Sequence, residues 1–239
     1  MRGSVGPVLG LPDGIEACLF DLDGVLSQTA KVHAAAWKQM FDAYLKERDG
    51  EGYKPFDAHH DYDEYVDGKP RPDGVRDFLK ARGIDAGEAL VKELGDRKND
   101  LVLDIIKRDG VQAYDGSVKY VHAAQDAGLK LAVVSSSANA KDVLKAIGIL
   151  GLFTEVVDGH AVAEGGLKGK PAPDTFLEGA KRLQVEPAHA AVFEDALAGV
   201  AAGRAGHFGA VIGVDRVGQA DALAAHGATR VVQDLGELL

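Results

Sequence analysis

The sequence lacks several features that would each point to a particular class of protein. Cys18 is the single cysteine among 239 residues, so an internal disulfide is impossible and we expect a reducing, cytoplasmic environment. No apolar run reaches the length of a membrane-spanning helix. Residues 1–14 contain no apolar core of the kind found in signal peptides, and we expect them to be a surface lead-in. These absences predict a soluble protein that has no membrane partner.

Positive charge is also scarce. The chain carries 27 Lys and Arg against 37 Asp and Glu, which gives a net charge of −10 and argues against binding to nucleic acid or to an anionic membrane. An anionic substrate would have to be met by positive charge concentrated at one site. Hydrophobic residues make up 46% of the chain, enough for a sizeable core in one domain or in one domain with a smaller insert. We expect a monomer.

The most informative stretch lies at residues 17–25. A short apolar run with the bulk of a buried strand ends at two carboxylates, Asp21 and Asp23, and Gly24 then lets the chain turn. Ligands of open α/β sheets bind outside the carboxyl ends of the strands, so these acids would face a substrate. One carboxylate could attack a phosphorus or carbonyl centre while the other moves a proton, and a divalent cation would relieve their repulsion. The alternative is a polar turn that only closes the strand.

A long amphipathic helix is predicted after this turn, at residues 30–47, with Thr29 as its N-terminal cap. Residues 49–68 are polar and include the adjacent histidines His59 and His60 beside several aspartates. These could be offered as a metal site, but adjacent side chains diverge, and an exposed loop explains them better. Three shorter helical pieces follow, at residues 75–82, 88–94 and 97–107, separated by Gly83, Gly87 and Gly95.

From residue 115 on, strand patterns alternate with helical patterns. Strands are predicted at 129–134, 155–157, 190–193, 210–214 and 229–232, and helices at 117–127, 140–147, 174–183, 196–205 and 220–226. This alternation is typical of an α/β fold with a doubly wound, Rossmann-like parallel sheet. The helical block should lie over the carboxyl edge of the sheet as a lid. We therefore expect a core domain, residues 1–28 and 114–239, and an inserted all-helical cap domain, residues 29–113.

The strand predicted at 129–134 should deliver polar groups to the same edge of the sheet. It ends in Ser135-Ser136-Ser137-Ala138-Asn139 and runs into a helix, so hydroxyl groups and unpaired amides could bind an anion there. Ordinary helix capping is the alternative. Ser135 and Ser136 are the candidate phosphate-binding residues, and Asn139 is a candidate for substrate contact.

Two further segments carry charge. Lys170 lies in a segment fixed by Pro171 and Pro173, which could hold its ammonium group for a phosphate, although most lysines are solvated. Glu194 and Asp195 follow the strand at 190–193 directly, and acids there could be helix caps or the ligands of a magnesium ion. Together, the charged and polar residues at these strand ends indicate a functional site far more specifically than any one of them does alone.

The order of these segments resembles that of the haloacid dehalogenase superfamily of phosphotransferases. Its four signatures would be Asp21-Leu22-Asp23-Gly24, Ser135, Lys170 in Lys-Pro-Ala-Pro-Asp, and Glu194-Asp195. The resemblance covers the chain from about residue 15, and the helical insert after the first signature looks like the cap of the beta-phosphoglucomutase branch. Matches to that branch and further candidate substrate contacts are Thr29, His33, Trp37, Arg71, Lys98, Asn99 and Asn139.

The resemblance implies a role for each core residue. Asp21 would be the nucleophile that becomes an aspartyl phosphate, and Asp23 would protonate the leaving oxygen and then activate the incoming hydroxyl. The implied Mg²⁺ ligands are the Asp21 carboxylate, the Asp23 backbone carbonyl, Glu194 and Asp195, and the implied phosphate-binding residues are Ser135, Ser136 and Lys170. Positive charge from the magnesium ion and Lys170 would stabilise the negative charge that builds on the phosphoryl group during transfer.

The resemblance also assigns substrate contacts to the cap. Arg71 looks like the arginine that grips a distal phosphate, and Lys98 lies in a motif that contacts substrate. His33 has the spacing found in beta-phosphoglucomutases, although a single histidine on an apolar helix is usually a core residue. A closing cap with Arg71 and Lys98 could use remote binding energy to keep water from the phosphoenzyme.

Some positions depart from the pattern of the family. Gln28 stands where many relatives have Asp, Ala196 replaces a frequent Ser, and Gly74 replaces a polar residue near Arg71. The polar stretch 49–66 also looks longer than in compact relatives. These departures touch the choice of substrate and leave the phosphoryl-transfer residues intact.

Three functions follow as hypotheses for a small phosphorylated sugar as substrate. The first is a Mg²⁺-dependent mutase that interconverts beta-glucose 1-phosphate and glucose 6-phosphate through a bisphosphate. The second is a phosphatase for a sugar phosphate or a similar small metabolite, which would share the core residues and differ in how the cap treats water. The third is a catalytically silent sensor of phosphosugars, and the intact set of catalytic residues speaks against it.

Overall fold

A six-stranded parallel sheet forms the centre of the molecule. The computed structural model describes residues 8–239. The strands lie in the order β3-β2-β1-β4-β5-β6, and every neighbouring pair is parallel. Their bounds are Ala17–Phe20 (β1), Lys130–Val134 (β2), Glu155–Val157 (β3), Ala190–Glu194 (β4), Ala210–Val214 (β5) and Arg230–Val232 (β6). The predicted strands are confirmed to within one residue at each end.

The two faces of the sheet carry separate hydrophobic clusters, because successive side chains of a strand point to opposite faces. Cys18 and Phe20 of β1 pack with Tyr120 in one cluster. Ala17 and Leu19 belong to the other cluster. Since β1 is buried on both faces, its sequence is apolar throughout and shows no alternation with polar residues.

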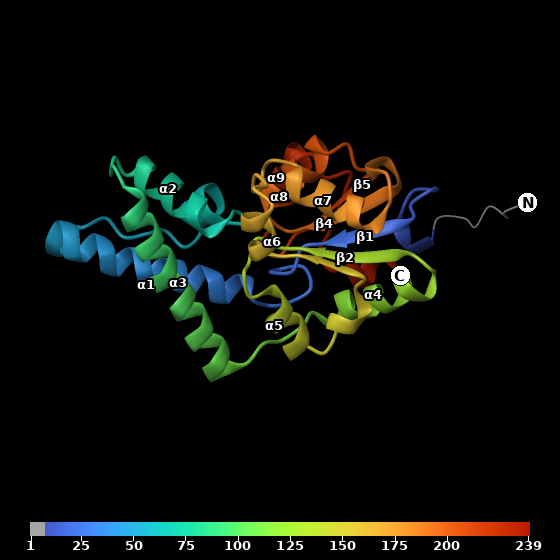
Figure 1. Cartoon of the computed structure of the whole chain (residues 1–239), viewed down its shortest axis with the longest axis horizontal. Coiled ribbons are helices and arrows are strands. Elements are labelled where there is room, and N and C mark those ends of the chain that lie inside the picture. Colours follow the sequence, from blue (N-terminus) through green and yellow to red (C-terminus); the bar gives the residue numbers. More distant parts are fainter. Residues whose placement is uncertain (1–7) are drawn as a thin grey trace, which may run out of the picture.

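Helices cover both faces of the sheet (Figure 1). Residues of α4 (Asp115–Asp126) and α5 (Ala140–Ala146) belong to the first cluster, and residues of α7 (Asp174–Leu183), α8 (Leu197–Ala205) and α9 (Ala220–His226) belong to the second. This doubly wound arrangement is the fold class that the alternation predicted. The short helix α6 (Gly159–Glu164) follows β3; sequence reasoning missed it, because six residues are too few to show a helical period.

Three helices form the insert between β1 and α4, at one end of the molecule (Figure 1). They are α1 (Ala30–Asp49), α2 (Arg71–Ala81) and α3 (Glu88–Asp109), with a 3-10 turn at Gly50–Gly52 and a π-helical turn at Tyr62–Val66. Their apolar faces meet in a third cluster, in which the ring of Phe41 lies 5.2 Å from that of Trp37 and 4.2 Å from that of Phe78. The predicted all-helical cap is thereby confirmed.

Two predictions about these helices were wrong in detail. The pieces at 88–94 and 97–107 are one continuous helix, α3, which passes through Gly95. An added Cβ at Gly95 would lie 3.5 Å from Cγ of Arg71, so this glycine serves the close packing of α3 on α2 and does not end a helix. Thr29 stands at the predicted N-cap position of α1 but makes no side-chain capping bond with the helix; its hydroxyl group donates to Asp23 instead.

The stretch 49–68 is also only partly the exposed loop that was predicted. His59 and His60 are exposed. Phe56 is 1% exposed and Asp61 is 7% exposed, and a carboxylate oxygen of Asp61 accepts from Nη2 of Arg82 at 2.7 Å. The segment is therefore fastened to the cap core and has exposed polar turns only in between.

The predicted surface lead-in packs onto the sheet domain from Leu9 onward. A 3-10 turn spans Val8–Gly10, the hydroxyl group of Tyr120 donates to the Leu9 carbonyl at 2.9 Å, and Leu11 is 3% exposed. Residues 1–7 of that prediction lie outside the described residues. Within residues 8–239, the structure contains no helix that is both long and apolar enough to cross a membrane.

Candidate active site

The carboxyl edge of the sheet brings the predicted catalytic residues together. Asp21 follows β1, Ser135 follows β2, and Glu194 ends β4. Since β2 and β4 flank β1, side chains distant in sequence meet at this edge, as expected for an open α/β sheet. A cavity of about 560 Å³ lies there, lined by residues of both the sheet domain and the cap. The predicted site residues that line it are Asp21, Asp23, His33, Trp37, Arg71, Lys98, Asn99, Ser136 and Asp195.

Lys170 is buried at this edge of the sheet and links two acids. Its Nζ donates to Oδ1 of Asp21 at 2.6 Å, to Oε1 of Glu194 at 2.5 Å and to the Val134 carbonyl at 3.2 Å. Burial lowers the pKa of Lys170, but the charges of Asp21 and Glu194 outweigh burial and raise that pKa above its usual value. The side chain is 0% exposed, so Lys170 is a buried cation and not a solvated surface lysine.

Three carboxylates beside Lys170 could hold a divalent cation. One oxygen each of Asp21, Glu194 and Asp195 lies within 4.8 Å of the others, and all three residues are buried. Burial raises the pKa of Asp21 well above its usual range, Lys170 opposes this effect, and Glu194 adds to it. Burial and then the charges of Asp67 and Glu194 raise the pKa of Asp195. The structure thus has clustered hard oxygen donors and an excess of buried negative charge, which fit a divalent cation such as Mg²⁺.

Two glycines make room for these acids. Gly24 has φ of +89°, and a Cβ at this position would overlap the Asp195 carboxylate. A Cβ at Gly199 in α8 would overlap the Glu194 carboxylate, whose Oε2 accepts from the Ala196 amide at 2.9 Å. A larger residue at either glycine would displace an acid, so the turn and the helix are shaped around the acidic cluster.

Asp23 is held by groups from the cap. The Thr29 hydroxyl donates to Oδ1 of Asp23, and Nε2 of His33 lies 3.1 Å from the same oxygen. Burial raises the pKa of Asp23, but the charge and hydrogen bond of His33 and the hydrogen bond of Thr29 outweigh it and lower the pKa to about 2. His33 is therefore not a satisfied core histidine: it reaches from α1 to one of the two predicted catalytic acids.

Lys98 continues this chain of contacts from the far side of His33. Its Nζ lies 2.6 Å from Nδ1 of His33 and 4.8 Å from the ring centre of Trp37. Which of the two groups donates in this contact depends on which ring nitrogens of His33 carry a proton. Burial, opposed by Asp23 and assisted by Arg71, lowers the pKa of Lys98 to about 7. The cap thus contains a lysine that is two contacts away from Asp23 and whose charge changes near neutral pH.

Hydrogen bonds join the cap to the loop after β2. Oγ of Ser136 donates to the Gly68 carbonyl at 2.8 Å, and Nδ2 of Asn139 donates to Oδ1 of Asn99 at 3.1 Å. Ser135 is 2% exposed, and its Oγ accepts from the amide two residues later at 3.1 Å. These contacts hold the cap against the core, and the phosphate-binding roles of Ser135 and Ser136 stay predictions.

Arg71 begins α2 and lines the cavity from the side of the cap. Among the described residues, its buried Nη1 has no hydrogen-bond partner. An unpaired buried donor costs free energy, and carboxylates and phosphates are the anions that a guanidinium group binds best. The cavity therefore offers an unused anion-binding group to a ligand.

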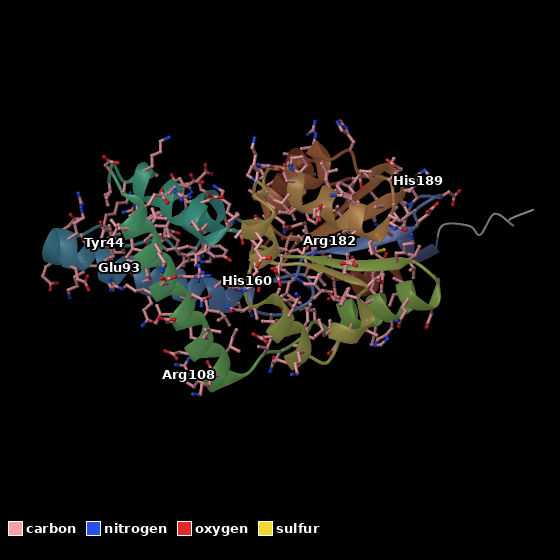
Figure 2. All side chains as sticks on the ribbon, viewed as in Figure 1. Tyr44, Glu93, Arg108, His160, Arg182 and His189 are labelled. Atoms are coloured by element: carbon pink, nitrogen blue, oxygen red, sulfur yellow. The ribbon has the colours of Figure 1, made fainter. Side chains whose placement is uncertain are left out.

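Tyr62, Asp67 and His160 are among the residues that line this cavity and that sequence reasoning missed. Burial and the charge of Glu194 raise the pKa of Asp67 to about 7, and a hydrogen bond from the Tyr62 hydroxyl opposes them. Tyr62 and Asp67 lie in the stretch that was interpreted as an exposed loop. His160 lies on α6, and Figure 2 shows it on the side of the sheet domain that faces the cap helices. No local pattern marked α6, so no signal pointed to His160.

A helical cap over the acidic carboxyl edge of a parallel sheet, with a buried lysine bonded to two of its acids, defines the class of this protein. The chain belongs to the haloacid dehalogenase-like hydrolase family, whose family model matches residues 15–207.

Its relatives within the family include beta-phosphoglucomutases. The chain is 54% identical to the beta-phosphoglucomutase of Mycobacterium bovis, over 97% of this chain and 94% of that protein, and 34% identical to that of Bacillus subtilis, over 79% and 78%. The crystal structure of beta-phosphoglucomutase from Clostridium difficile superposes with a TM-score of 0.77 at 28% identity, covering 94% of this chain and 93% of that one. The chain thus falls in the beta-phosphoglucomutase-like branch.

Proposed function

We propose that the protein is a Mg²⁺-dependent mutase that interconverts beta-glucose 1-phosphate and glucose 6-phosphate through a bisphosphate. One observation carries this proposal beyond the similarity to named mutases. Arg71 lines the cavity that contains Asp21, and among the described residues its buried Nη1 has no hydrogen-bond partner. Lys170 and the acidic cluster serve one phosphoryl group, and Arg71 offers a place for a second. A sugar with two phosphates needs two such places.

Asp21 and Asp23 divide the chemistry between them. In the first half of the reaction, the phosphoryl group on Asp21 moves to the C6 hydroxyl of beta-glucose 1-phosphate, and Asp23 takes the proton of that hydroxyl as the new P–O bond forms. The bisphosphate then turns around in the site. In the second half, an Asp21 oxygen attacks the phosphorus of the C1 phosphate, the bond to the C1 oxygen breaks, and Asp23 returns its proton to that oxygen.

Other groups supply positive charge and place it. Lys170 holds Oδ1 of Asp21 at 2.6 Å, which fixes the nucleophile and offsets negative charge next to the transferring group. Mg²⁺, bound by Asp21, the Asp23 carbonyl, Glu194 and Asp195, would supply charge neutralisation at the phosphoryl oxygens. We propose that Ser135 and Ser136 donate to those oxygens once the cap loosens its hold on the loop.

The cap keeps water from the phosphoenzyme in this proposal. Residues 29–113 act as a cap domain that opens for the sugar to turn, and residues 1–28 and 114–239 act as the core domain. His33 contacts Asp23 from the cap, and Lys98 contacts His33. Asp23 is therefore oriented for proton transfer only when the cap is closed. This requirement favours transfer to a bound sugar over transfer to water.

A phosphatase for a sugar phosphate is the second candidate, because it needs the same core residues. One assay separates the two: the purified protein is primed with a glucose 1,6-bisphosphate and given beta-glucose 1-phosphate and Mg²⁺, and glucose 6-phosphate and free phosphate are measured together. The mutase produces glucose 6-phosphate in excess over free phosphate. Free phosphate without glucose 6-phosphate would overturn the mutase and leave the phosphatase.

Two properties of the enzyme complete the proposal. We propose that it works in the cytoplasm, since its single cysteine, Cys18, is a buried thiol and could form no disulfide within the chain in an oxidising compartment. We also propose that it is a monomer. The exposed large apolar side chains of the described residues, such as Leu103, Val217 and Leu239, lie on separate segments of the chain, which is normal for a protein surface.

A further inference from the structure

Arg216 is a largely buried arginine to which neither the sequence motifs nor the proposed chemistry assigns a role. It lies two residues beyond β5, and its side chain is 15% exposed. Nε donates to the Gly24 carbonyl at 2.8 Å, and Nη2 donates to the Val25 carbonyl at 3.4 Å. Nη1 donates to the Gln233 carbonyl at 2.8 Å and to Oδ2 of Asp234 at 3.2 Å. One guanidinium group therefore ties the turn after the catalytic acids to the C-terminal end of the chain.

The same guanidinium group also contacts the second chain segment between cap and core. Its Cζ lies 3.6 Å from the ring centre of Tyr114. Tyr114 ends the segment that returns from α3, residues 110–114, and its amide donates to the carbonyl of Leu26 at 3.0 Å. Leu26 belongs to the outgoing segment, residues 21–29. The two segments are thus paired with each other, and Arg216 touches both.

This arrangement depends on properties that lysine lacks. Arginine presents a planar fork of N–H donors while its face stacks on an aromatic ring, and an ammonium group cannot do both. The turn it holds has little freedom of its own, because Gly24 adopts φ of +89° with the Asp195 carboxylate packed against it. The Val25 carbonyl also accepts from Oγ of Ser117 at 2.6 Å. The backbone of the turn is therefore fixed from the core by side chains.

We propose that Arg216 is a positioning residue that holds the Asp23 turn and both connections to the cap in one place on the core. The inference rests on the proposed function. Gly24 directly follows Asp23, and the Asp23 carboxylate meets Thr29 and His33 at the start of α1. A fixed turn lets each closure of the cap bring His33 to the same place beside Asp23. A loose turn would let the acid and its cap partners miss one another, although substrate could still bind.

The test compares R216K and R216Q with R230K as a matched control. Arg230 starts β6 and donates from Nη1 to the Gly10 carbonyl at 3.3 Å, so it is a second arginine that bonds to backbone but lies away from the cavity. Each protein is checked for folding by circular dichroism. Turnover of beta-glucose 1-phosphate and of a simple phosphate ester gives kcat and KM, and hydrogen exchange with mass spectrometry follows peptides that cover residues 21–29 and 110–116.

A positioning role predicts a split between the kinetic constants. In folded R216K, kcat falls about 10- to 100-fold, the loss expected when catalytic groups are misplaced by about 1 Å, while KM stays unchanged because Lys170 and Arg71 are untouched. Hydrogen exchange becomes faster in both peptides together, and R230K behaves as the wild type. A purely structural role would reduce the folded fraction and leave kcat per folded molecule unchanged.

Two results would overturn the inference. One is wild-type kcat in folded R216K; the other is faster exchange in neither peptide or in only one of them. If the wild type turns over no phosphate ester at all, the proposed function fails. The exchange comparison between R216K and R230K still decides whether Arg216 holds the two segments, because it needs no turnover.

Discussion

Replacing Lys98 with Met tests how much free energy the folded protein loses by burying the charge of this lysine in the cap. Met has almost the same length as Lys and no charge. Burial lowers the pKa of Lys98 from its usual 10.5 to about 7, and this difference corresponds to about 5 kcal/mol at about 1.4 kcal/mol per pKa unit. Water in the cavity screens part of that cost, so about 5 kcal/mol is an upper bound.

The sign of the pH dependence follows from the lowered pKa. Below about pH 7, Lys98 is protonated in the folded and unfolded states alike, and the full cost of burying the charge is present. Between about pH 7 and 10.5 the unfolded chain keeps a proton that the folded protein has released, so the free energy of unfolding rises with pH. The wild type should gain up to about 1.4 kcal/mol per pH unit more than K98M in this window.

Urea unfolding at several values between about pH 7.5 and 9.5, followed by circular dichroism, measures this difference. K92M is the matched control, because Lys92 lies on the same helix and its side chain is 79% exposed. The free energies of K92M and the wild type should rise in parallel. The reasoning is refuted if K98M and the wild type also rise in parallel, since Lys98 would then have an ordinary pKa in the folded protein.

Three further perturbations address the site itself. His33→Ala should lower the formation of glucose 6-phosphate about 100-fold, because the group that orients Asp23 is lost, while the release of free phosphate should change little. Equal losses in both products would contradict the proposed role of the cap. Arg71→Lys should weaken binding of glucose 1,6-bisphosphate about 10- to 100-fold by calorimetry, the value of one or two charge-assisted hydrogen bonds, and unchanged affinity would remove the second phosphate site. Mg²⁺ at about 100 times its Kd should stabilise the protein against heat by about 2.7 kcal/mol relative to the chelated protein, and this gain should vanish in Asp195→Asn; the same gain in the variant would place the ion elsewhere.

The parts of the site that the sequence predicted are those that follow a strand directly. Asp21 and Glu194 each end a short apolar run, and a buried parallel strand delivers whatever follows it to the carboxyl edge of the sheet. The order of strands in space could not be read in this way, but the edge is shared by all of them. Local pattern was therefore enough to expect Asp21 and Glu194 at one site.

The parts of the site and the fold that the sequence did not predict depend on contacts between distant segments. Asp67 lies near the acidic cluster because the cap folds over the sheet, and its sequence neighbours Val66 and Gly68 carry no sign of this contact. Arg216 is bound to Gly24, 192 positions away in sequence. Gly95 looked like a break in a helix, yet it only makes room for Arg71. In each case the tertiary partner determines the role, and the local sequence does not contain that partner.

The most direct test of the account is to find where the phosphoryl group is attached during turnover. The protein is mixed with Mg²⁺ and glucose 1,6-bisphosphate, quenched rapidly in acid, digested and examined by mass spectrometry. The account predicts one added phosphoryl group on Asp21 in the wild type and none in Asp21→Asn. Covalent phosphate on another residue such as His33, or turnover by Asp21→Asn at the wild-type rate, would contradict it.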